Sequence, residues 1–448
     1  MSNEIYEVRC PQDIDKGVLT EVIVPGSKSI TNRALLLAAM ANGTSTLKGC
    51  LTSDDAKHFL ICLKTLGFPV KETSDNRLGS DIVITGFGGA IPKKKAEIYV
   101  GSAGTAARFL VAMLAFSDGE YTVNSSEQMK KRPMQPLIDV LRSSGANVVC
   151  TEEEGHFPLH IVGAKDKSRI PDSFTVNIDQ SSQFLSALLI AVGTLGKKAE
   201  IHVVGSHGLS YVDLTAEMMK DFGITAKKQV ADGKVKYLFS GNGSYKACEY
   251  AIEPDMSAAA YFYALAAVLG IKTAVKGVNS HMLQGDTAFL KVLEKMGCKV
   301  HGMDMDAEMI SVVGAENGKL KGGFTVDMSA FSDQALTLAA IAPFADKPVT
   351  ITGIGHIRLQ ECDRIKAIVN NLTALGIKTE EQYDAITIYP GMPVGCEIET
   401  YEDHRVAMSF ALTGLRTKGV RILNPSCCKK TFAEYFQVLE RVLTEISE

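Results

Sequence analysis

LKTLGFPV at residues 63–70 and VLRSSGANVV at 140–149 are two copies of one phrase, an apolar helix that ends at a glycine and leads into a strand. Further copies read MMKDFGITA (218–226), VLEKMGCKV (292–300) and NLTALGIKT (371–379). Their glycines, Gly67, Gly145, Gly223, Gly297 and Gly376, are spaced by 78, 78, 74 and 79 residues, and glycine is the commonest residue just past a helix end. A fixed period of this length indicates repeated supersecondary units, and six of them, at about 75 residues each, fill the 448 residues.

Each period holds the same order of elements. A polar cluster precedes an apolar helix such as ITNRALLLAAMA (30–41), a β-branched strand follows, and a second amphipathic helix ends at the glycine before two further strands. We therefore predict an α/β fold of repeated β-α-β-α-β-β units. Because six units are too large for one core, we expect two lobes of three units each, with the active site in the cleft between them.

Two similar strands mark where the chain is expected to pass between the lobes. LTEVIVP (19–25) runs into Gly26, and CEYAIEP (248–254) runs into Asp255. We expect one lobe over 26–253, and the other over 1–25 together with 254–448.

The composition excludes several classes of function. Lys and Arg number 47 against 51 Asp and Glu, a net charge of −4, and Trp is absent, so we expect no nucleic-acid partner. The longest uncharged apolar stretch, 257–271, is too short to span a membrane, and the N-terminus does not resemble a signal peptide. The ten cysteines form no C-x-x-C pair and the nine histidines are isolated, which favours a cytoplasmic protein without a metal site. We expect a monomer.

Five polar clusters stand where the first helix of a unit is expected to begin. They lie at 26–29, 101–105, 179–183, 332–334 and 403–405. Helix N-termini attract anions, because their backbone N–H groups are unpaired and the helix dipole is positive there. The simpler interpretation is that each cluster only caps its helix, since Ser, Thr and Asp are preferred caps.

Cations near the second helices strengthen the anion interpretation. Arg132 directly precedes Pro133, which is expected to start a helix, and Arg364 and Lys430 occupy similar places in later units. Arginine forks suit carboxylates and phosphates, so these side chains point to a substrate with several negative charges.

Eight motifs, in order along the whole chain, resemble the 5-enolpyruvylshikimate-3-phosphate synthase family of enolpyruvyl transferases. They are VPGSKSITNRALLLAA (24–39), GSAGTAARFL (101–110), QMKKRP (128–133), DQSSQFLSALL (179–189), FSDQALT (331–337), QECDR (360–364), YEDHRVAM (401–408) and CKKTF (428–432). The resemblance implies two lobes of three repeats, the substrates shikimate 3-phosphate and phosphoenolpyruvate, and no metal or organic cofactor.

The resemblance also implies roles for individual residues. Shikimate 3-phosphate is expected to contact Lys28, Ser29, Arg33, Ser181, Ser182, Asp333, His356 and Gln360. Phosphoenolpyruvate is expected to contact Lys28, Gly104, Arg132, Gln183, Arg364, Arg405 and Lys430, and Thr105 and His404 complete the predicted binding set.

Three residues are expected to be catalytic. Asp333 is assigned as the general base that takes the proton of the 5-hydroxyl group, while Glu361 and Lys28 move the proton at C3 of phosphoenolpyruvate. The cations around the phosphate are expected to stabilise it as it leaves. The alternatives are that Asp333 is only a helix cap and Glu361 only an exposed helix acid.

Three positions depart from the family pattern. Gln360 stands where a lysine is usual, Gly208 where a phosphate-binding serine is common, and Phe109 where many members carry proline. Gln360 therefore leaves one cationic contact missing or supplied elsewhere. Ser206 or Ser210 could replace the serine at 208.

Two other functions compete with this prediction. A related enolpyruvyl transferase acts on UDP-N-acetylglucosamine, but its first loop typically has Asn after the lysine, where this chain has Ser29, and its mobile loop carries a reactive cysteine that SSEQMKKRP (125–133) lacks. The second alternative is a non-catalytic protein that binds anionic metabolites. The acid–base pair Asp333 and Glu361 argues against it, because carboxylates do not help a pure anion binder.

Overall fold

The computed structural model describes residues 4–76, 79–241, 243–303 and 307–447. The chain forms two compact units, Gly26–Ile252 and Met1–Pro25 with Glu253–Glu448. The second passage between the units falls after Ile252, one residue before the position expected from the sequence.

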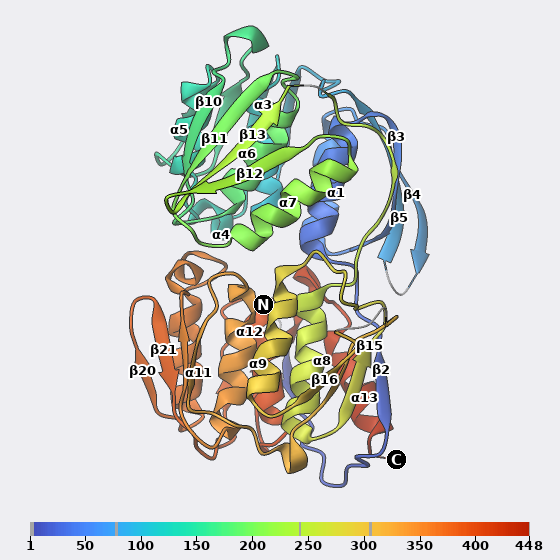
Figure 1. Cartoon of the computed structure of the whole chain (residues 1–448), viewed down its shortest axis with the longest axis vertical. Helices are drawn as coiled ribbons and strands as arrows, with labels where there is room; N and C mark the ends of the chain where they lie inside the picture. The colour runs from blue at the N-terminus through green and yellow to red at the C-terminus, as the bar shows by residue number, and fades with distance from the viewer. Residues whose placement is uncertain (1–3, 77–78, 242, 304–306, 448) are drawn as a thin grey trace. The chain divides into compact units, whose positions relative to one another are not determined.

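Five repeats have the predicted β-α-β-α-β-β order, and each builds one four-stranded sheet (Figure 1). In every such sheet the first two strands are parallel, and the fourth strand lies between the second and the third and runs antiparallel to both. The second repeat along the chain consists of β6(Lys95–Tyr99), α3(Gly104–Ala115), β7(Glu120–Asn124), α5(Gln135–Ser143), β8(Asn147–Cys150) and β9(Leu159–Val162). The third consists of β10(Ser173–Asn177), α6(Gln183–Gly193), β11(Lys198–Val204), α7(Leu209–Asp221), β12(Ala226–Ala231) and β13(Lys234–Ser240).

Because the chain passes twice between the units, two repeats take their first strand from a segment that does not directly precede their first helix. One repeat of unit Gly26–Ile252 consists of α1(Lys28–Met40), β3(Asn42–Cys50), α2(Asp54–Thr65), β4(Val70–Asn76) and β5(Gly79–Phe87), and its first strand is β14(Glu249–Ala251), from the other end of the unit. The corresponding repeat of the other unit consists of α8(Met256–Leu269), β15(Lys272–Val275), α9(Phe289–Lys295), β16(Lys299–His301) and β17(Ser311–Val313), and its first strand is β2(Leu19–Val22). Figure 1 shows β2 beside β15.

The last repeat differs from the prediction. The fifth repeat is complete, with β18(Phe324–Asp327), α10(Ala335–Ile341), β19(Val349–Thr352), α11(Arg364–Ala374), β20(Thr379–Glu381) and β21(Ala385–Ile388). The sixth has β22(Glu397–Ile398), α12(His404–Gly414), β23(Arg421–Leu423) and α13(Tyr435–Glu445), and ends there. Its sheet has three strands, because β1(Ile5–Glu7) from the N-terminus takes the place of the fourth strand and pairs antiparallel with β23. The prediction of six complete units is therefore wrong for the sixth.

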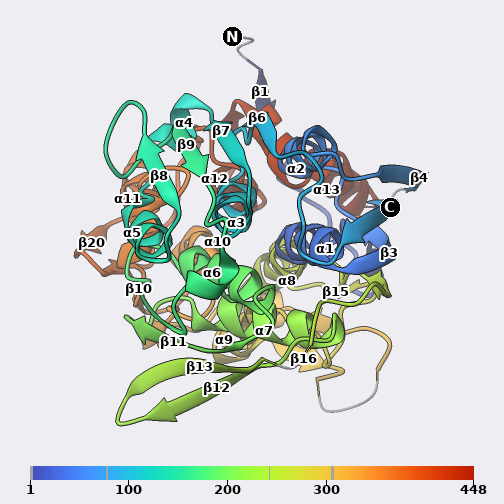
Figure 2. The same ribbon diagram turned by 90° about the horizontal axis from the view of Figure 1, so that it is seen from above.

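The first helix of each repeat lies inside its unit. Nearly every residue of α1, α3, α6, α8, α10 and α12 is buried, which agrees with sequences that are apolar on all sides. The second helices, such as α5, bury one stripe and expose the other. Seen from above, α1, α3 and α6 lie in the middle of their unit, and its sheets lie around them (Figure 2). In the described part of the chain, no helix has the length and apolar character needed to cross a membrane.

The five repeated glycines end their helices as predicted. Their φ angles lie between +78° and +94°, in the left-handed region that glycine adopts without steric cost.

Candidate active site

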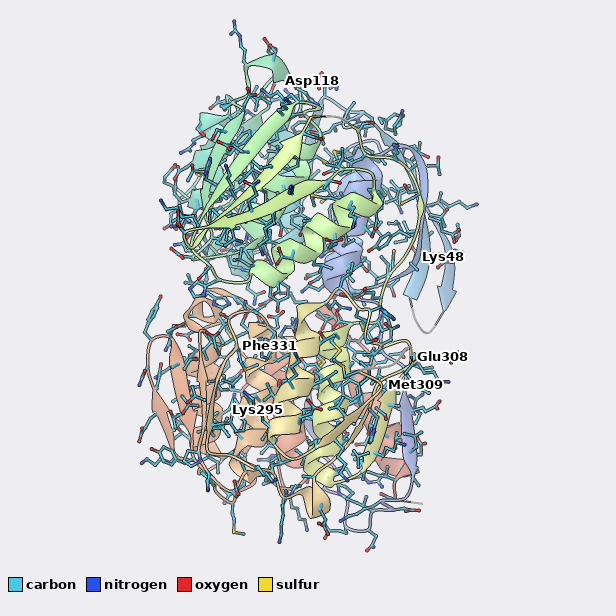
Figure 3. The ribbon with its side chains drawn as sticks, in the orientation of Figure 1. Lys48, Asp118, Lys295, Glu308, Met309 and Phe331 are labelled. Atoms are coloured by element: carbon cyan, nitrogen blue, oxygen red, sulfur yellow. The ribbon has the colours of Figure 1, made fainter. Side chains whose placement is uncertain are left out.

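The five polar clusters lie at the N-termini of inner helices, as the sequence predicted. Helix α1 begins at Lys28, α3 at Gly104, α6 at Gln183 and α12 at His404. The fifth cluster forms a 3₁₀ turn, Ser332–Gln334, that leads directly into α10. Figure 3 labels Phe331, the residue just before this turn.

The N-cap residues of the three inner helices of unit Gly26–Ile252 provide no side-chain cap, although the Ser181 hydroxyl accepts from the N–H of Gln183, the first residue of α6 (3.3 Å). The N-cap residues of α1, α3 and α6 are Ser27, Ala103 and Ser182, and none of them accepts a hydrogen bond from its helix. The outer helix α2 does have a serine cap, Ser53. The simple capping interpretation therefore fails for the N-cap serines Ser27 and Ser182, and the positive end of each helix dipole still favours an anion.

Arg33 links four helices of this unit, α1, α7, α6 and α3. It lies on α1 and donates to the Thr215 hydroxyl (2.7 Å) and the Tyr211 carbonyl oxygen (2.9 Å), both on α7. Its guanidinium also contacts Ser186 on α6 and covers the ring of Phe109 on α3. Burial lowers the pKa of Arg33 to about 10, so it keeps its charge at neutral pH.

Among the residues that the structure describes, the guanidinium of Arg33 contacts hydroxyl and carbonyl oxygens and an aromatic ring, and no carboxylate. A buried cation with only neutral partners gains more from an incoming anion than a paired one does.

A second cation lies against the start of α3. Arg132 is buried, and its guanidinium lies so close to Gly104 that a side chain at 104 would collide with it. Arg108 lies near the same helix start and donates hydrogen bonds to the carbonyl oxygens of Gly104 (3.2 Å) and Pro133 (3.0 Å). The expectation that Pro133 starts a helix is wrong, because α5 begins at Gln135 and Arg132 lies in the turn after α4(Glu127–Lys130).

The remaining predicted residues of this unit lie on the same helix starts. Gln183 donates to the Thr105 hydroxyl at 3.2 Å, which joins the start of α6 to that of α3. Lys28, in the first turn of α1, pairs with Asp55 at 3.1 Å. Asp55 lies outside the sequence motifs. It lies in the first turn of α2, where an acid is usual, so its position gave no sign of a role.

In the other unit, cations and carboxylates form one network around Arg364. The Arg364 guanidinium pairs with Asp403 (2.8 Å), Glu361 (2.9 Å) and Asp333 (3.1 Å). Burial alone would lower the pKa of Arg364, but these three carboxylates hold it above its ordinary value. Asp403 also caps α12, and the sequence analysis gave it no role beyond its cluster.

Two further cations close the network. Arg405 pairs with the second oxygen of Asp333 at 2.7 Å, and Lys430 pairs with Glu361 at 3.4 Å. Burial acts to lower the pKa of Arg405, and the neighbouring carboxylates with Asp333 first among them raise it well above its ordinary value. Both predicted acid–base carboxylates therefore lie between two cations, which hold their orientation.

The other predicted residues of this unit surround the network. His356 shares a hydrogen bond of 2.8 Å with Ser332, beside Asp333. Gln360 accepts a hydrogen bond from Arg364, so this departure from the family pattern adds an acceptor rather than a cation. His404 is buried in the first turn of α12, next to Asp403.

The two units thus carry different chemistry. Unit Gly26–Ile252 presents helix starts with buried cations, a set of groups that binds anions. The other unit presents carboxylates held by arginines and a lysine, a set that can move protons and stabilise a charged leaving group. Within the described residues, no three His, Cys, Asp or Glu side chains are grouped as metal ligands.

Known proteins similar to this chain agree on one family. The family model described as EPSP synthase (3-phosphoshikimate 1-carboxyvinyltransferase) matches residues 13–439. The 3-phosphoshikimate 1-carboxyvinyltransferase of Nostoc punctiforme is 40% identical over 433 residues, which cover 96% of this chain and 98% of the relative. The protein named 3-phosphoshikimate 1-carboxyvinyltransferase 2 of Halalkalibacterium halodurans is 41% identical, over 94% of this chain and 91% of the relative.

Solved structures share the fold. EPSP synthase from Acinetobacter baumannii superposes with a TM-score of 0.75 at 23% identity, covering 98% of both chains. The enolpyruvyl transferase NikO from Streptomyces tendae gives a TM-score of 0.72 at 14% identity, over 99% of this chain and 98% of the other. At these identities the likeness shows the two-lobed α/β fold alone.

Proposed function

The chain belongs to the EPSP synthase family, and from this premise we propose that it transfers the enolpyruvyl group of phosphoenolpyruvate to the 5-hydroxyl group of shikimate 3-phosphate. The products are 5-enolpyruvylshikimate 3-phosphate and phosphate. The enzyme is thus a 3-phosphoshikimate 1-carboxyvinyltransferase of aromatic amino-acid biosynthesis.

One observation carries the assignment of the site. The motif residues that the family resemblance singles out gather into an anion-binding set in one unit and an acid–base set in the other, although they are scattered over some 400 residues of sequence. We propose that both sets act on the same pair of substrates.

The anion-binding set holds the substrates in this proposal. The 3-phosphate lies against Ser181 and Ser182 at the start of α6, while Lys28, Ser29 and Arg33 hold the rest of shikimate 3-phosphate. The start of α6 supports this role, because a dianionic phosphate gains from the positive end of the helix dipole there.

We propose roles toward phosphoenolpyruvate for Arg132, Gly104 and Gln183 of unit Gly26–Ile252, and for Arg364, Arg405 and Lys430 of the other unit. His356 and Gln360 lie on the shikimate side, and Thr105 and His404 support the first turns of α3 and α12.

The acid–base set performs the chemistry. Glu361 and Lys28 deliver a proton to C3 of phosphoenolpyruvate, so that C2 becomes electrophilic. Asp333 takes the proton of the 5-hydroxyl group as its oxygen bonds to C2, which gives a tetrahedral intermediate. A C3 proton is then removed, the C2–O bond to phosphate breaks with its electron pair going to phosphate, and the cations stabilise the departing anion.

We further propose that the protein works as a cytoplasmic monomer without nucleic acid. All ten cysteines are free, which suits a reducing compartment, and the net charge of −4 opposes binding to a polyanion.

Release of phosphate tests the reaction. The full-length protein is incubated with phosphoenolpyruvate and either shikimate 3-phosphate or UDP-N-acetylglucosamine, and phosphate is measured against time. We expect release that depends on shikimate 3-phosphate. Release only with the nucleotide sugar would assign the chain to the related enolpyruvyl transferase, and tight binding of both substrates without release would make it a binding protein.

A further inference from the structure

A buried carboxylate that the proposed reaction does not use lies behind Asp333. Asp286 belongs to the 3₁₀ turn Gly285–Ala288, and only 4% of it is exposed. It accepts a hydrogen bond from the amide of Gln334 at 3.0 Å and contacts the Ser257 hydroxyl of α8 at 3.3 Å. Gln334 is itself fully buried and follows Asp333 in the sequence, so Asp286 holds the residue next to the assigned base.

Asp286 is also part of the charge balance around Asp333. The charged groups that face it are Asp333 on the 3₁₀ turn before α10, Arg405 on α12 and Asp255 at the start of α8. Burial, and then the charge of Asp333, raise the pKa of Asp286 to about 6, while Arg405 partly opposes this shift.

We propose that Asp286 is a positioning residue whose negative charge keeps Asp333 basic enough to take the proton of the substrate hydroxyl, an inference that rests on the proposed function. Asp333 is held by two guanidinium groups, those of Arg364 and Arg405. Two cations alone favour the charged carboxylate so strongly that it becomes a poor proton acceptor. A second negative charge on Asp286 compensates part of that effect, and the hydrogen bond from the Gln334 amide ties Asp286 to the residue that follows Asp333.

The proposal gives the turnover rate a defined pH dependence. Above about pH 6 Asp286 is charged and supports Asp333. Below that pH it takes up a proton, its charge disappears, and Asp333 is left with the two arginines as a weaker base. We therefore expect kcat to fall from a higher to a lower level as the pH decreases through about 6.

The test compares kcat of the full-length enzyme and of Asp286→Asn from pH 5 to pH 8, with both substrates saturating. Asparagine keeps the size and the hydrogen-bonding shape of the side chain but not its charge. We expect the variant to be slower than the wild type at pH 7.5, by less than the roughly 100-fold to 10,000-fold that loss of a whole general base costs. The two rates should converge near pH 5, because the wild-type Asp286 is then neutral as well.

Two features keep the outcome interpretable. The phosphate groups of the substrates also titrate near pH 6, but a step that they cause persists in the variant, whereas a step caused by Asp286 disappears. Ser257→Ala is the matched control, since it removes a hydrogen bond of Asp286 without touching the charge, and it should keep the wild-type step. Asp286→Ser replaces the Asn variant if the latter does not melt cooperatively.

Each result decides the question. A variant that keeps the wild-type step, or an equal loss of kcat at every pH, overturns the proposal and leaves Asp286 a purely structural residue. A wild-type profile without any step overturns it as well. Absence of turnover by the wild-type protein contradicts instead the proposed function, so the two failures are distinguishable.

Discussion

Asp333 holds two arginines at once, and this double contact shapes what its substitution does. Arg364 and Arg405 each donate to a different oxygen of the carboxylate. In Asp333→Asn the amide still accepts from one of them but takes up no proton. We expect kcat to fall by about 100-fold to 10,000-fold, the usual contribution of a general base, while shikimate 3-phosphate still raises the melting temperature.

The matched control for that variant is Asp118→Asn, which removes an exposed aspartate that pairs with Lys94 (Figure 3). Surface pairs of this kind contribute little, so its kcat should equal that of the wild type. Near-normal turnover by Asp333→Asn would show that another group takes the proton.

Gly104 has no space for a side chain. A Cβ atom there would stand 2.8 Å from the Arg108 guanidinium and would collide with that of Arg132. Both atoms are the far ends of flexible side chains, so Gly104→Ala should fold with Arg132 displaced. We expect the KM for phosphoenolpyruvate to rise about tenfold or more, as for a lost hydrogen bond to a charged group, while the KM for shikimate 3-phosphate stays nearly constant. An unchanged KM for phosphoenolpyruvate would remove Arg132 from its proposed role.

At this scale the sequence predicts residue types better than residue contacts. The cations and the acid–base pair stand in recognisable motifs, so they can be named from the sequence. Their partners Asp55, Asp286 and Asp403 stand in ordinary helix-start positions, where an acid is expected on local grounds alone. Only the packing of helices shows their partners: Asp55 meets Lys28 within one repeat, whereas Asp403 and Asp286 meet cations of other repeats.

At the scale of elements, the capping of the inner helices differs between the two units. The N-cap residues of α1, α3 and α6 provide no side-chain cap, whereas α8 and α12 are capped by Asp255 and Asp403. An aspartate cap neutralises the positive end of a helix, so the capped helices are poor anion sites. The same sequence signal, a polar residue before an apolar helix, thus leads to two opposite outcomes, and the sequence alone does not separate them.

Gly208 couples the start of α7 to that of α6. It is the N-cap of α7 with a φ of +64°, and a Cβ atom there would stand 2.7 Å from the Ser182 hydroxyl oxygen. We expect Gly208→Ala to cost about 1 kcal/mol of stability through left-handed strain and to raise the KM for shikimate 3-phosphate several-fold by displacing Ser182. The melting temperature and both KM values measure these effects.

Gly196→Ala is the matched control for this variant. Gly196 has nearly the same φ, +63°, but a Cβ atom there meets nothing within 4 Å. It should lose similar stability and keep both KM values. If the KM for shikimate 3-phosphate is the same in the two variants, Ser182 does not bind the phosphate group.

At the scale of the whole molecule, pairings between the ends of the chain escape sequence analysis. The period of about 75 residues predicts five complete repeats correctly, although two of them take their first strand, β14 or β2, from a distant part of the chain. The sixth sheet instead takes β1, whose three residues Ile5–Glu7 pair with Arg421–Leu423. A strand this short has no periodic signature of its own, and its partner lies more than 400 residues away.

The exchange of first strands makes unit Gly26–Ile252 complete in itself. All strands of its three sheets, including β14, come from this one continuous segment. We expect a fragment of residues 26–252 to fold cooperatively and to be stabilised by shikimate 3-phosphate, since its helix starts and Arg33 are retained. It should release no phosphate from phosphoenolpyruvate, because it lacks Asp333 and Glu361.

A shorter fragment, 26–247, is the matched comparison because it lacks only β14 and the residues beside it. Without β14 the parallel partner of β3 is missing, together with the bonds from Thr46 N–H to Cys248 and from Ile252 N–H to Lys48. An unpaired strand edge costs stability and exposes a site for aggregation, so this fragment should melt at a lower temperature and aggregate more readily. Thermal melting by circular dichroism, with and without shikimate 3-phosphate, compares the two fragments. Equal melting temperatures would mean that β14 contributes nothing to the unit, and a longer fragment that melts without any response to the ligand would place the binding of shikimate 3-phosphate outside this unit.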